Sequence, residues 1–393
     1  MRILQVFNQY INRGGEEVWV EKLPELSADD HEWSELRFRS SDWTGDGAPS
    51  RLQQARWLGD NPDSRRRLRE SVADFRPDVL LFHNLIPVAS LGLYDEAKRI
   101  GIPVVQYIHN FRPFSPSGRL WVNDRPEEAA LRGNPWPEIF GGAWNDSRLK
   151  TGVVAWHLHR LRNSGALDAV RGWIAISDAM RDAFEQAGIP GRRLTTLRHC
   201  WETSEHLEAT AEGDYYLFIG ALYPYKGIDV LLKAWRLLEE ELGGQCPKLV
   251  IGGKGSLEGE VRTASERSDR IEYLEFVEGA FKQQLVAGCR ALLVPSVWAE
   301  PLGLVVYEAY ENRRPVISSG SGGLAETVDD GRTGILHLND DPASLTSAVK
   351  RMEAAGPAGR EAMGASGREW LEHSASPEDW RRSFDEMLRT AVS

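Results

Sequence analysis

The sequence predicts an α/β protein with two Rossmann-like, doubly wound parallel-sheet domains, and three observations support this fold class. The chain has 393 residues, which exceeds the usual size of one hydrophobic core. Short apolar runs alternate with longer amphipathic segments in both halves, as is typical of strand–helix units around a parallel sheet. Hydrophobic residues make up 41% of the chain, enough for large buried cores.

Four strands are predicted in the first half, at 2–8, 77–84, 102–110 and 172–177. Each ends in a polar residue, at the edge where open parallel sheets present their ligand-binding groups. The segment from Phe111 to about Asp168 breaks the alternation and is rich in Pro and Gly. An excursion of this length usually forms a lid or a recognition surface.

Five strands are predicted in the second half, at 215–222, 248–255, 271–277, 291–296 and 315–320. Predicted helices at 227–242 and 281–289 separate them. The connection between the two domains is expected within 187–205, which mixes Gly, Pro and polar residues. We therefore predict one domain over 1–195 and a second over 196–375.

Charge and cysteine content exclude several classes of function. A net charge of -11 disfavours nucleic acid as a partner. Cys200, Cys246 and Cys289 are far apart, so neither a disulfide framework nor a zinc site is indicated, and a reducing cytosol fits. No apolar window approaches about 18 residues, and the N-terminal apolar run is too short for a signal peptide. The expectation is a cytoplasmic protein that is soluble or at most peripheral on a membrane.

The nonamer EPLGLVVYE, from Glu300 to Glu308, is the most informative motif. Pro301 and Leu302 suit the first turn of a helix, so Gly303 and Leu304 would offer free amides at its positive end. Such an end is a natural seat for a diphosphate, and the flanking acids would accept hydrogen bonds from hydroxyl groups. On spacing alone, the simpler alternative is favoured, in which Glu300 is a charge at the N-terminus of the helix and Glu308 is a surface residue.

The neighbouring motifs reverse that preference. The nonamer follows a predicted strand edge, and two glycine-rich turns within 319–336 follow the next strand. Lys226 begins a helix after the first strand of this domain and is a plausible phosphate counter-charge. Gly253 and Lys254 lie at the end of another predicted strand of this domain, at 248–255.

Taken in order, these motifs resemble the family 4 retaining glycosyltransferases of GT-B fold. The resemblance rests on E-x7-E after a "PS" strand, a "KG" turn and a "GG…E…G" loop, together with "NRGGEE" at 12–17, "HN" at His109 and "AISDAM" at 175–180. It implies acceptor binding by the first domain, nucleotide-sugar binding by the second, and a last helix at about 376–393 that packs back onto the first domain.

By position, the resemblance implies a role for each candidate residue. Glu308 is similar to the acid that binds ribose and Glu300 to the acid that contacts the donor sugar, while Lys226 with the Gly303 and Leu304 amides resembles the diphosphate clamp. His109 is similar to the histidine that reaches the donor sugar, although a structural histidine at a strand end is the alternative. The remaining correspondences are the phosphate-facing loop at Gly14 and Gly15 and the nucleobase-contacting backbone at Phe276 and Val277. Pro295 and Ser296 are interpreted as turn residues only.

One position departs from the family pattern. Many relatives carry an arginine that binds phosphate where this chain has Ala221. The loss of one charge-assisted contact would cost about 1.5–3 kcal/mol unless another cation replaces it. Arg13, Lys254 and Arg198 are the candidates, and the sequence does not choose among them.

The resemblance also implies a mechanism without a metal or another cofactor. The leaving diphosphate takes the proton of the incoming hydroxyl on the same face of the sugar, while the site stabilises the developing charges. The expected reaction moves a hexose-type sugar to a carbohydrate or lipid-linked glycan, in the assembly of surface polysaccharide. The competing hypotheses are a nucleotide-sugar epimerase and a non-catalytic sugar-nucleotide-binding protein; a nicotinamide dehydrogenase fits least because the G-x-G-x-x-G spacing is missing.

The acceptor side is less defined. Trp121, Trp136, Trp144 and Trp156 lie in or beside the excursion, and their flat faces suit stacking on sugar rings, although packing of a long loop explains them equally well. The basic, partly apolar segment 148–165 suggests peripheral contact with a membrane. The alternative, which the pattern favours, is an ordinary amphipathic helix packed on the first domain.

Overall fold

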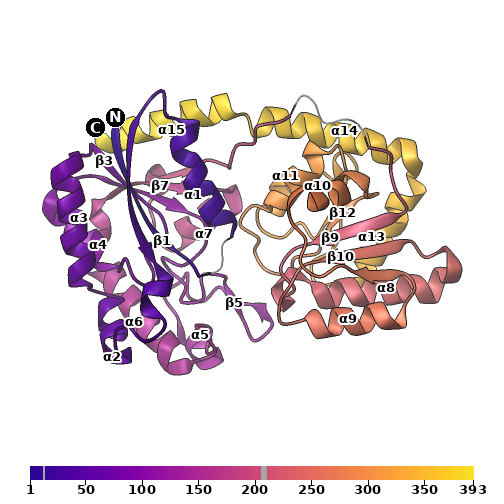
Figure 1. Ribbon diagram of the computed structural model, residues 1–393, viewed down its shortest axis with the longest axis horizontal. Coiled ribbons are helices and arrows are strands. Elements are labelled where there is room, and N and C mark those ends of the chain that lie inside the picture. Colours follow the sequence, from indigo (N-terminus) through magenta and orange to yellow (C-terminus); the bar gives the residue numbers. More distant parts are fainter. Residues whose placement is uncertain (12–13, 205–209) are drawn as a thin grey trace. The chain divides into compact units, whose positions relative to one another are not determined.

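A computed structural model describes residues 1–11, 14–204 and 210–393 (Figure 1). These residues form two compact units. Unit 1 contains Met1–Asn123, Glu127–His199 and Pro377–Ser393, and unit 2 contains Asp124–Pro126 and Cys200–Ser376. Unit 1 therefore includes the last helix of the chain. Arg13 and the last residue of the predicted connection, 205, lie outside the described residues.

The core of unit 1 is a six-stranded parallel sheet in the order β2-β1-β3-β4-β7-β8. Its strands are β1 (Arg2–Gln9), β2 (Glu32–Arg39), β3 (Val79–Phe82), β4 (Val104–Ile108), β7 (Val170–Ala175) and β8 (Leu194–Thr196). All residues of β3 and β4 are buried, which is the expected pattern for central strands covered on both faces. The sheet order places the loops after β1, β3 and β4 beside one another.

Eight helices belong to unit 1 among the described residues. They are α1 (Gly15–Leu26), α2 (Arg51–Trp57), α3 (Pro62–Phe75), α4 (Gly92–Ile100), α5 (Trp136–Gly141), α6 (Arg148–Asn163), α7 (Asp178–Gln186) and α15 (Pro377–Val392). The 3-10 turns η1 (Ser40–Trp43), η2 (Ala166–Ala169) and η3 (Gly191–Arg193) and the short strand β5 (Trp121–Val122) complete this part.

Helix α15 packs on β4 and β7 through its apolar face. Trp380, Phe384, Met387 and Leu388 are buried, and the Trp380 and Phe384 rings stack with centroids 4.8 Å apart. Phe384 also stacks on Trp33 of β2 at 6.3 Å. These contacts explain why a helix from the end of the chain belongs to unit 1.

A second six-stranded parallel sheet forms the core of unit 2, in the order β11-β10-β9-β12-β13-β14. Its strands are β9 (Tyr215–Ile219), β10 (Lys248–Gly252), β11 (Ile271–Tyr273), β12 (Leu292–Val294), β13 (Val316–Ser318) and β14 (Gly334–Leu336). The two sheets confirm the predicted fold class of two Rossmann-like parallel-sheet units. The strands β9, β12 and β13 are neighbours, so the loops that follow them share one edge.

Seven helices surround that sheet among the described residues of unit 2. They are α8 (Ile228–Leu242), α9 (Glu258–Arg267), α10 (Gly279–Gly288), α11 (Leu304–Glu311), α12 (Leu324–Thr327), α13 (Pro342–Ala354) and α14 (Gly356–Ser374). The 3-10 turns η4 (Pro224–Lys226) and η5 (Gly243–Gln245) and the short strand β6 (Arg125–Pro126) also belong here. None of the described helices combines the length and apolar character needed to span a membrane.

Strand β8 was expected as part of an irregular connection. The segment Leu194–Thr196 instead pairs with β7 in parallel register, with Leu194 opposite Trp173. The sequence prediction missed this strand because three residues flanked by Gly, Pro and Arg carry little periodicity, whereas the edge of β7 offers backbone partners. The boundary between the units, after His199, lies within the predicted connection.

The excursion after β4 is ordered by one buried carboxylate. Glu138 of α5 accepts hydrogen bonds from the Ser115 hydroxyl at 2.7 Å and the Ser117 amide at 2.6 Å. Burial raises the pKa of Glu138, although these hydrogen bonds oppose the shift. Helix α6 covers the same region with Val154, Leu158 and Leu161 buried, while Trp156 of that helix is exposed.

Candidate functional site

Three loops of unit 2, those after β9, β12 and β13, meet around Glu300. The Ser319 hydroxyl donates to the Ser296 carbonyl at 2.6 Å, and the Gly323 amide donates to the Glu300 carbonyl at 2.7 Å. Gly322 and Gly323 lie so close to residues 299–302 that a Cβ at either position would fall within 3 Å of their backbone. The glycine-rich turn is therefore required for the loops to pack together.

The Glu300 carboxylate is buried and has four hydrogen bonds. Lys226 donates to Oε1 at 2.9 Å and to Oε2 at 2.7 Å, and Oε2 also accepts from the Ser296 hydroxyl at 2.9 Å and the Trp298 indole at 2.8 Å. Burial raises the pKa of Glu300, but the Lys226 charge and these hydrogen bonds outweigh it, and the pKa lies below its usual range. The carboxylate is thus ionised and held in one orientation.

Helix α11 begins at Leu304, three residues later than predicted. Gly303 has a φ of 84°, in the left-handed region, and is the residue that precedes the helix. Pro301 and Leu302 therefore lie in the loop, and the prediction that Pro301 opens the helix was wrong. Since one helical turn holds 3.6 residues, Glu308 lies about one turn inside α11 and Glu300 lies before it. The Leu304 amide is still at the positive end.

The second acid of the motif, Glu308, pairs with a residue that the sequence did not single out. Lys282 of α10 lies 2.7 Å from Oε1 and 2.6 Å from Oε2 of Glu308. Both side chains are about a quarter exposed. The pair places the Glu308 carboxylate on the side of α11 that faces α10.

The loops after β10 and β11 carry the other predicted residues of unit 2. Gly253 has a φ of 150°, and a Cβ there would lie 1.8 Å from the Gly220 carbonyl oxygen, so only glycine fits. Lys254 is exposed, Phe276 is 60% exposed, and Val277 is buried. The exposed Phe276 ring and the adjacent backbone can therefore meet a planar ligand group, while Val277 packs inside.

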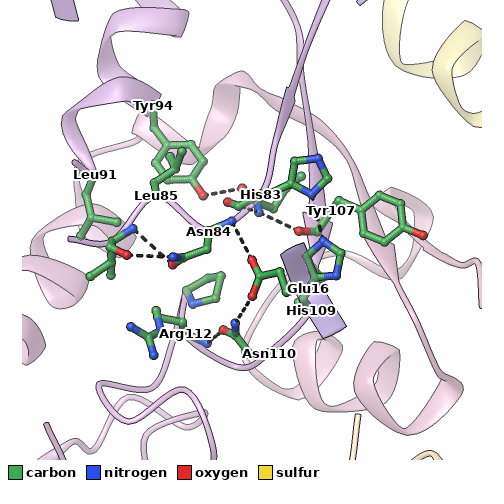
Figure 2. Close-up of a pocket in the computed structure, with 14 residues that line it drawn as sticks. Glu16, His83, Asn84, Leu85, Leu91, Tyr94, Tyr107, His109, Asn110 and Arg112 are labelled. Carbon is green, nitrogen blue, oxygen red and sulfur yellow. Dashed lines mark hydrogen bonds between the residues drawn. The ribbon is translucent and has the colours of Figure 1, made fainter. Parts of the chain in front are cut away.

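A small pocket in unit 1, with a volume of about 20 Å³, contains His109 (Figure 2). The His109 Nε2 and His83 Nδ1 atoms lie 2.9 Å apart, and His83 Nε2 lies 3.3 Å from the Gln5 amide oxygen. Burial lowers the pKa of His109 to about 3 and that of His83 well below its ordinary value. Both imidazoles are therefore neutral near pH 7.

Hydrogen bonding assigns the proton on each ring. The Gln5 oxygen can only accept, so His83 Nε2 carries a proton and His83 Nδ1 accepts from His109 Nε2. His109 Nδ1 is then an unprotonated acceptor. It is buried and has no hydrogen-bond partner among the described residues.

Glu16 lines the same pocket. Its Oε1 accepts from the Asn84 amide at 3.3 Å, and its Oε2 accepts from the Asn110 side chain at 3.1 Å, as Figure 2 shows. Burial, followed by the charge of Glu17, raises the pKa of Glu16 to about 8 even though Arg112 opposes the shift. Glu16 is protonated at neutral pH, and no pattern in the sequence distinguished it from Glu17.

Gly14 and Gly15 stand at the start of α1 and are exposed. The Gly14 amide donates to Glu17 Oε2 at 2.8 Å, and the Tyr10 amide donates to Glu17 Oε1 at 3.0 Å. Glu17, which is buried, therefore fixes the backbone at Tyr10 and at Gly14.

Of the predicted site residues, the structure brings Lys226 and Glu300 into direct contact. His109, Gly14 and Gly15 belong to unit 1, and the other predicted residues belong to unit 2. Ser296, Trp298 and Lys282 were missed: Ser296 was interpreted as a turn residue, and nothing in the local sequence connects Lys282 to Glu308. The described residues contain no group of three or more His, Cys, Asp or Glu side chains arranged to hold a metal ion.

The candidates for the cation that replaces the arginine at Ala221 differ in their surroundings. Arg198 belongs to unit 1 and donates to Asp178 at 2.7 Å. Lys254 is exposed in the loop after β10. Arg13 lies outside the described residues.

Comparison with known families matches most of the chain. Residues 18–205 match the family described as Glycosyltransferase Family 4, and residues 213–354 match Glycosyl transferases group 1. Glycogen synthase from Thermus thermophilus is 34% identical over 44% of this chain, which spans only 38% of that relative's length. D-inositol 3-phosphate glycosyltransferase from Frankia alni is 28% identical over 75% of this chain and 71% of its own length.

Solved structures share the fold. HepE from Anabaena, in complex with UDP, has a TM-score of 0.69 at 17% identity, covering 99% of this chain and 100% of its own. Sucrose-phosphate synthase from Thermosynechococcus elongatus has a TM-score of 0.69 at 16% identity, covering 99% of this chain and 98% of its own. Both comparisons extend over the two units.

The raised pKa of Glu16 predicts a pH-dependent stability. The folded state keeps this carboxyl protonated up to pH of about 8, whereas the unfolded chain ionises it near 4.5, so stability falls as pH rises through this window. We expect the Glu16→Gln variant to lose that dependence. Its free energy of unfolding, relative to that of wild type, should rise by on the order of 3 kcal/mol between pH 5 and pH 8.5, because each pKa unit corresponds to about 1.4 kcal/mol. Urea unfolding at both pH values measures it; parallel curves for the two proteins would contradict it.

Proposed function

Because the chain belongs to the family 4 glycosyltransferases of GT-B fold, we propose that it transfers a sugar from a nucleoside diphosphate sugar to a hydroxyl group of an acceptor. The observation that carries this proposal is the ionised Glu300, held by Lys226 in the loop that leads into α11. Solved structures of HepE with UDP and with UDP-glucose support a nucleotide sugar as the donor.

In this proposal, Glu300 and Lys226 each retain one free hydrogen-bonding position. Among the described residues, Glu300 Oε2 already accepts three hydrogen bonds, whereas Oε1 accepts only that from Lys226. Oε1 would therefore accept from a hydroxyl of the donor sugar. Lys226 directs two of its three protons to Glu300, which leaves one for a phosphate oxygen. The Leu304 amide at the helix end would bind the diphosphate with it.

The remaining residues of unit 2 would bind the nucleoside. Glu308 would accept hydrogen bonds from the ribose hydroxyls, since the Lys282 pair leaves lone pairs on both of its oxygens. Phe276 and the backbone of Val277 would contact the base. Gly253 and Lys254 lie in the loop after β10, where the exposed Lys254 is available as a counter-charge to phosphate.

Unit 1 would bind the acceptor, for which we propose a carbohydrate or lipid-linked glycan used in surface polysaccharide assembly. His109 Nδ1 is an unprotonated acceptor and would take a hydrogen bond from a sugar hydroxyl. The glycines at 14 and 15 leave the backbone at the start of α1 open to close approach by a substrate. We place the protein in the cytoplasm, with contact to the inner face of a membrane through α6 as one way to reach a lipid-linked acceptor.

The proposed reaction moves a hexose-type sugar with retention of configuration. The bond from the anomeric carbon to the diphosphate oxygen breaks, the acceptor oxygen attacks the same face, and the leaving diphosphate takes the acceptor's proton. Lys226 and the Leu304 amide would stabilise the charge that develops on the diphosphate, and Glu300 would orient the sugar. No side chain has to serve as a general base in this scheme.

The donor site is tested by two substitutions. Glu308→Gln and Lys226→Ala each remove a charge-assisted hydrogen bond, worth about 1.5–3 kcal/mol, so the donor KM should rise by roughly 10- to 100-fold. Initial rates over a range of donor concentration measure this effect. Lys350→Ala is the control, because Lys350 pairs with Glu241 on the exposed surface of the same unit. An unchanged donor KM in both folded variants would reject the assignment.

Metal independence is tested separately. Since Lys226 and the helix end supply the positive charge that the diphosphate needs, a chelator such as EDTA should leave the transfer rate unchanged within about twofold. The measurement is a rate assay in buffer treated with chelator, with and without added manganese. Loss of activity that manganese restores would show that this part of the proposal is wrong.

A further inference from the structure

The Arg112 guanidinium contacts two aromatic rings near the C-terminal end of β4 in unit 1. It follows β4 in the loop that begins the excursion, and its side chain is partly exposed. The guanidinium carbon lies 4.6 Å from the ring centre of Trp144 and 5.3 Å from that of Tyr10. Aromatic faces hold a guanidinium by cation–π and stacking contacts that do not use its N–H groups.

This guanidinium has no anionic partner in the described part of the chain. No described carboxylate lies within ion-pair distance of it, and its Nε–H is buried without a hydrogen-bond acceptor. The Nε–H groups of Arg198 and Arg290 are also buried without an acceptor, but each of those arginines is paired with a carboxylate through another nitrogen. The aromatic contacts explain how the Arg112 side chain is held, but they do not supply an anionic partner.

A structural arginine in the same unit provides the contrast. Arg162 also lies over an aromatic ring, with its guanidinium carbon 4.9 Å from the centre of Phe114. It donates to three backbone carbonyls, those of Ala130, Leu131 and Ala187. Packing on an aromatic ring is therefore compatible with several side-chain hydrogen bonds in this unit, whereas the Arg112 side chain has none among the described residues.

The acid beside Arg112 does not neutralise it at neutral pH. Arg112 and Glu16 line the same pocket, with Asn110 between them in Figure 2, where the Asn110 oxygen accepts from the Arg112 backbone amide at 2.9 Å. The groups that face Glu16 are Glu17, Arg112, Tyr10, Asn84 and Asn110, and the pKa of Glu16 is about 8. With Glu16 protonated, the positive charge of Arg112 is available to a ligand.

We propose that Arg112, clamped by Tyr10 and Trp144, is an anion subsite of unit 1 that binds a phosphate or carboxylate group carried by the acceptor. A guanidinium with free N–H groups matches either group with two parallel hydrogen bonds. The subsite deepens the proposed function, because the assignment of the ligand to the acceptor rests on it. Binding of the anion itself is independent of any transfer activity.

The test uses the full chain labelled with nitrogen-15 at tryptophan and titrated with inorganic phosphate or with acetate. The Trp144 indole resonance, assigned through Trp144→Phe, reports on the subsite. We expect a saturable shift of the Trp144 resonance with at least one anion. The dissociation constant should be at least tenfold larger in Arg112→Gln, and Arg112→Lys should recover part of the lost affinity. Tighter binding of phosphate would indicate a phosphorylated acceptor, and tighter binding of acetate an acidic sugar. Arg132→Gln, which changes an exposed arginine of the same unit, is the control.

Lys226→Ala separates this subsite from the phosphate seat of unit 2. The shift at Trp144 should persist in Lys226→Ala, and a shift that this variant removes would overturn the proposal. The proposal also fails if neither anion shifts Trp144, or if Arg112→Gln binds as tightly as wild type. If the protein binds an anion at Trp144 but transfers no sugar, the anion subsite is supported and the proposed function is rejected.

A second measurement applies if Arg112→Gln does not fold. Above pH 8, ionised Glu16 would oppose a bound anion, so phosphate affinity at Trp144 should fall at least threefold between pH 7 and pH 9 in wild type. In Glu16→Gln the same change of pH should have a smaller effect. Equal pH dependence in the two proteins would place the anion away from Glu16 and Arg112, which contradicts the proposal.

Discussion

The ion pair between Glu300 and Lys226 is the interaction on which the organisation of unit 2 depends. A buried carboxylate is stable only when its charge is balanced and its oxygens are hydrogen-bonded. Lys226 arrives from the loop after β9, and Ser296 and Trp298 come from the loop after β12. The turn after β13 closes on the Glu300 backbone through Gly323. Glu300 therefore ties together the three loops that follow adjacent strands, two through its carboxylate and the third through its backbone carbonyl.

The pocket of unit 1 that contains His109 uses burial in the opposite way. There, removal from water keeps ionisable groups neutral: the pKa of His109 falls to about 3, and the pKa of Glu16 rises to about 8. The chain Gln5–His83–His109 then decides which imidazole nitrogen accepts hydrogen bonds. The result is a set of uncharged groups suited to sugar hydroxyls, with Arg112 as a cation beside them. The two units thus present different chemistry on similar sheets.

Much of this arrangement could be predicted from the sequence, because strand ends, glycine turns and the E-x7-E spacing are local signals. The fold class followed from alternating apolar runs, and Glu300 and Lys226 followed from their positions after strands. The start of α11 could not be predicted, since Pro301 suits a first helical turn and the left-handed conformation of Gly303 is visible only in the structure. The partners Ser296 and Lys282 depend on contacts between distant segments, which no local pattern records.

The central claim is that unit 2 binds a nucleoside diphosphate through these loops. The most direct measurement is the thermal unfolding of the full chain with UDP, GDP, ADP and dTDP and with their sugar conjugates, because a ligand that binds only the folded state raises the melting temperature by mass action. The account predicts a saturable rise with at least one nucleotide, and a smaller rise in Lys226→Ala. The absence of a shift with every nucleotide, in a protein that unfolds cooperatively, would contradict it.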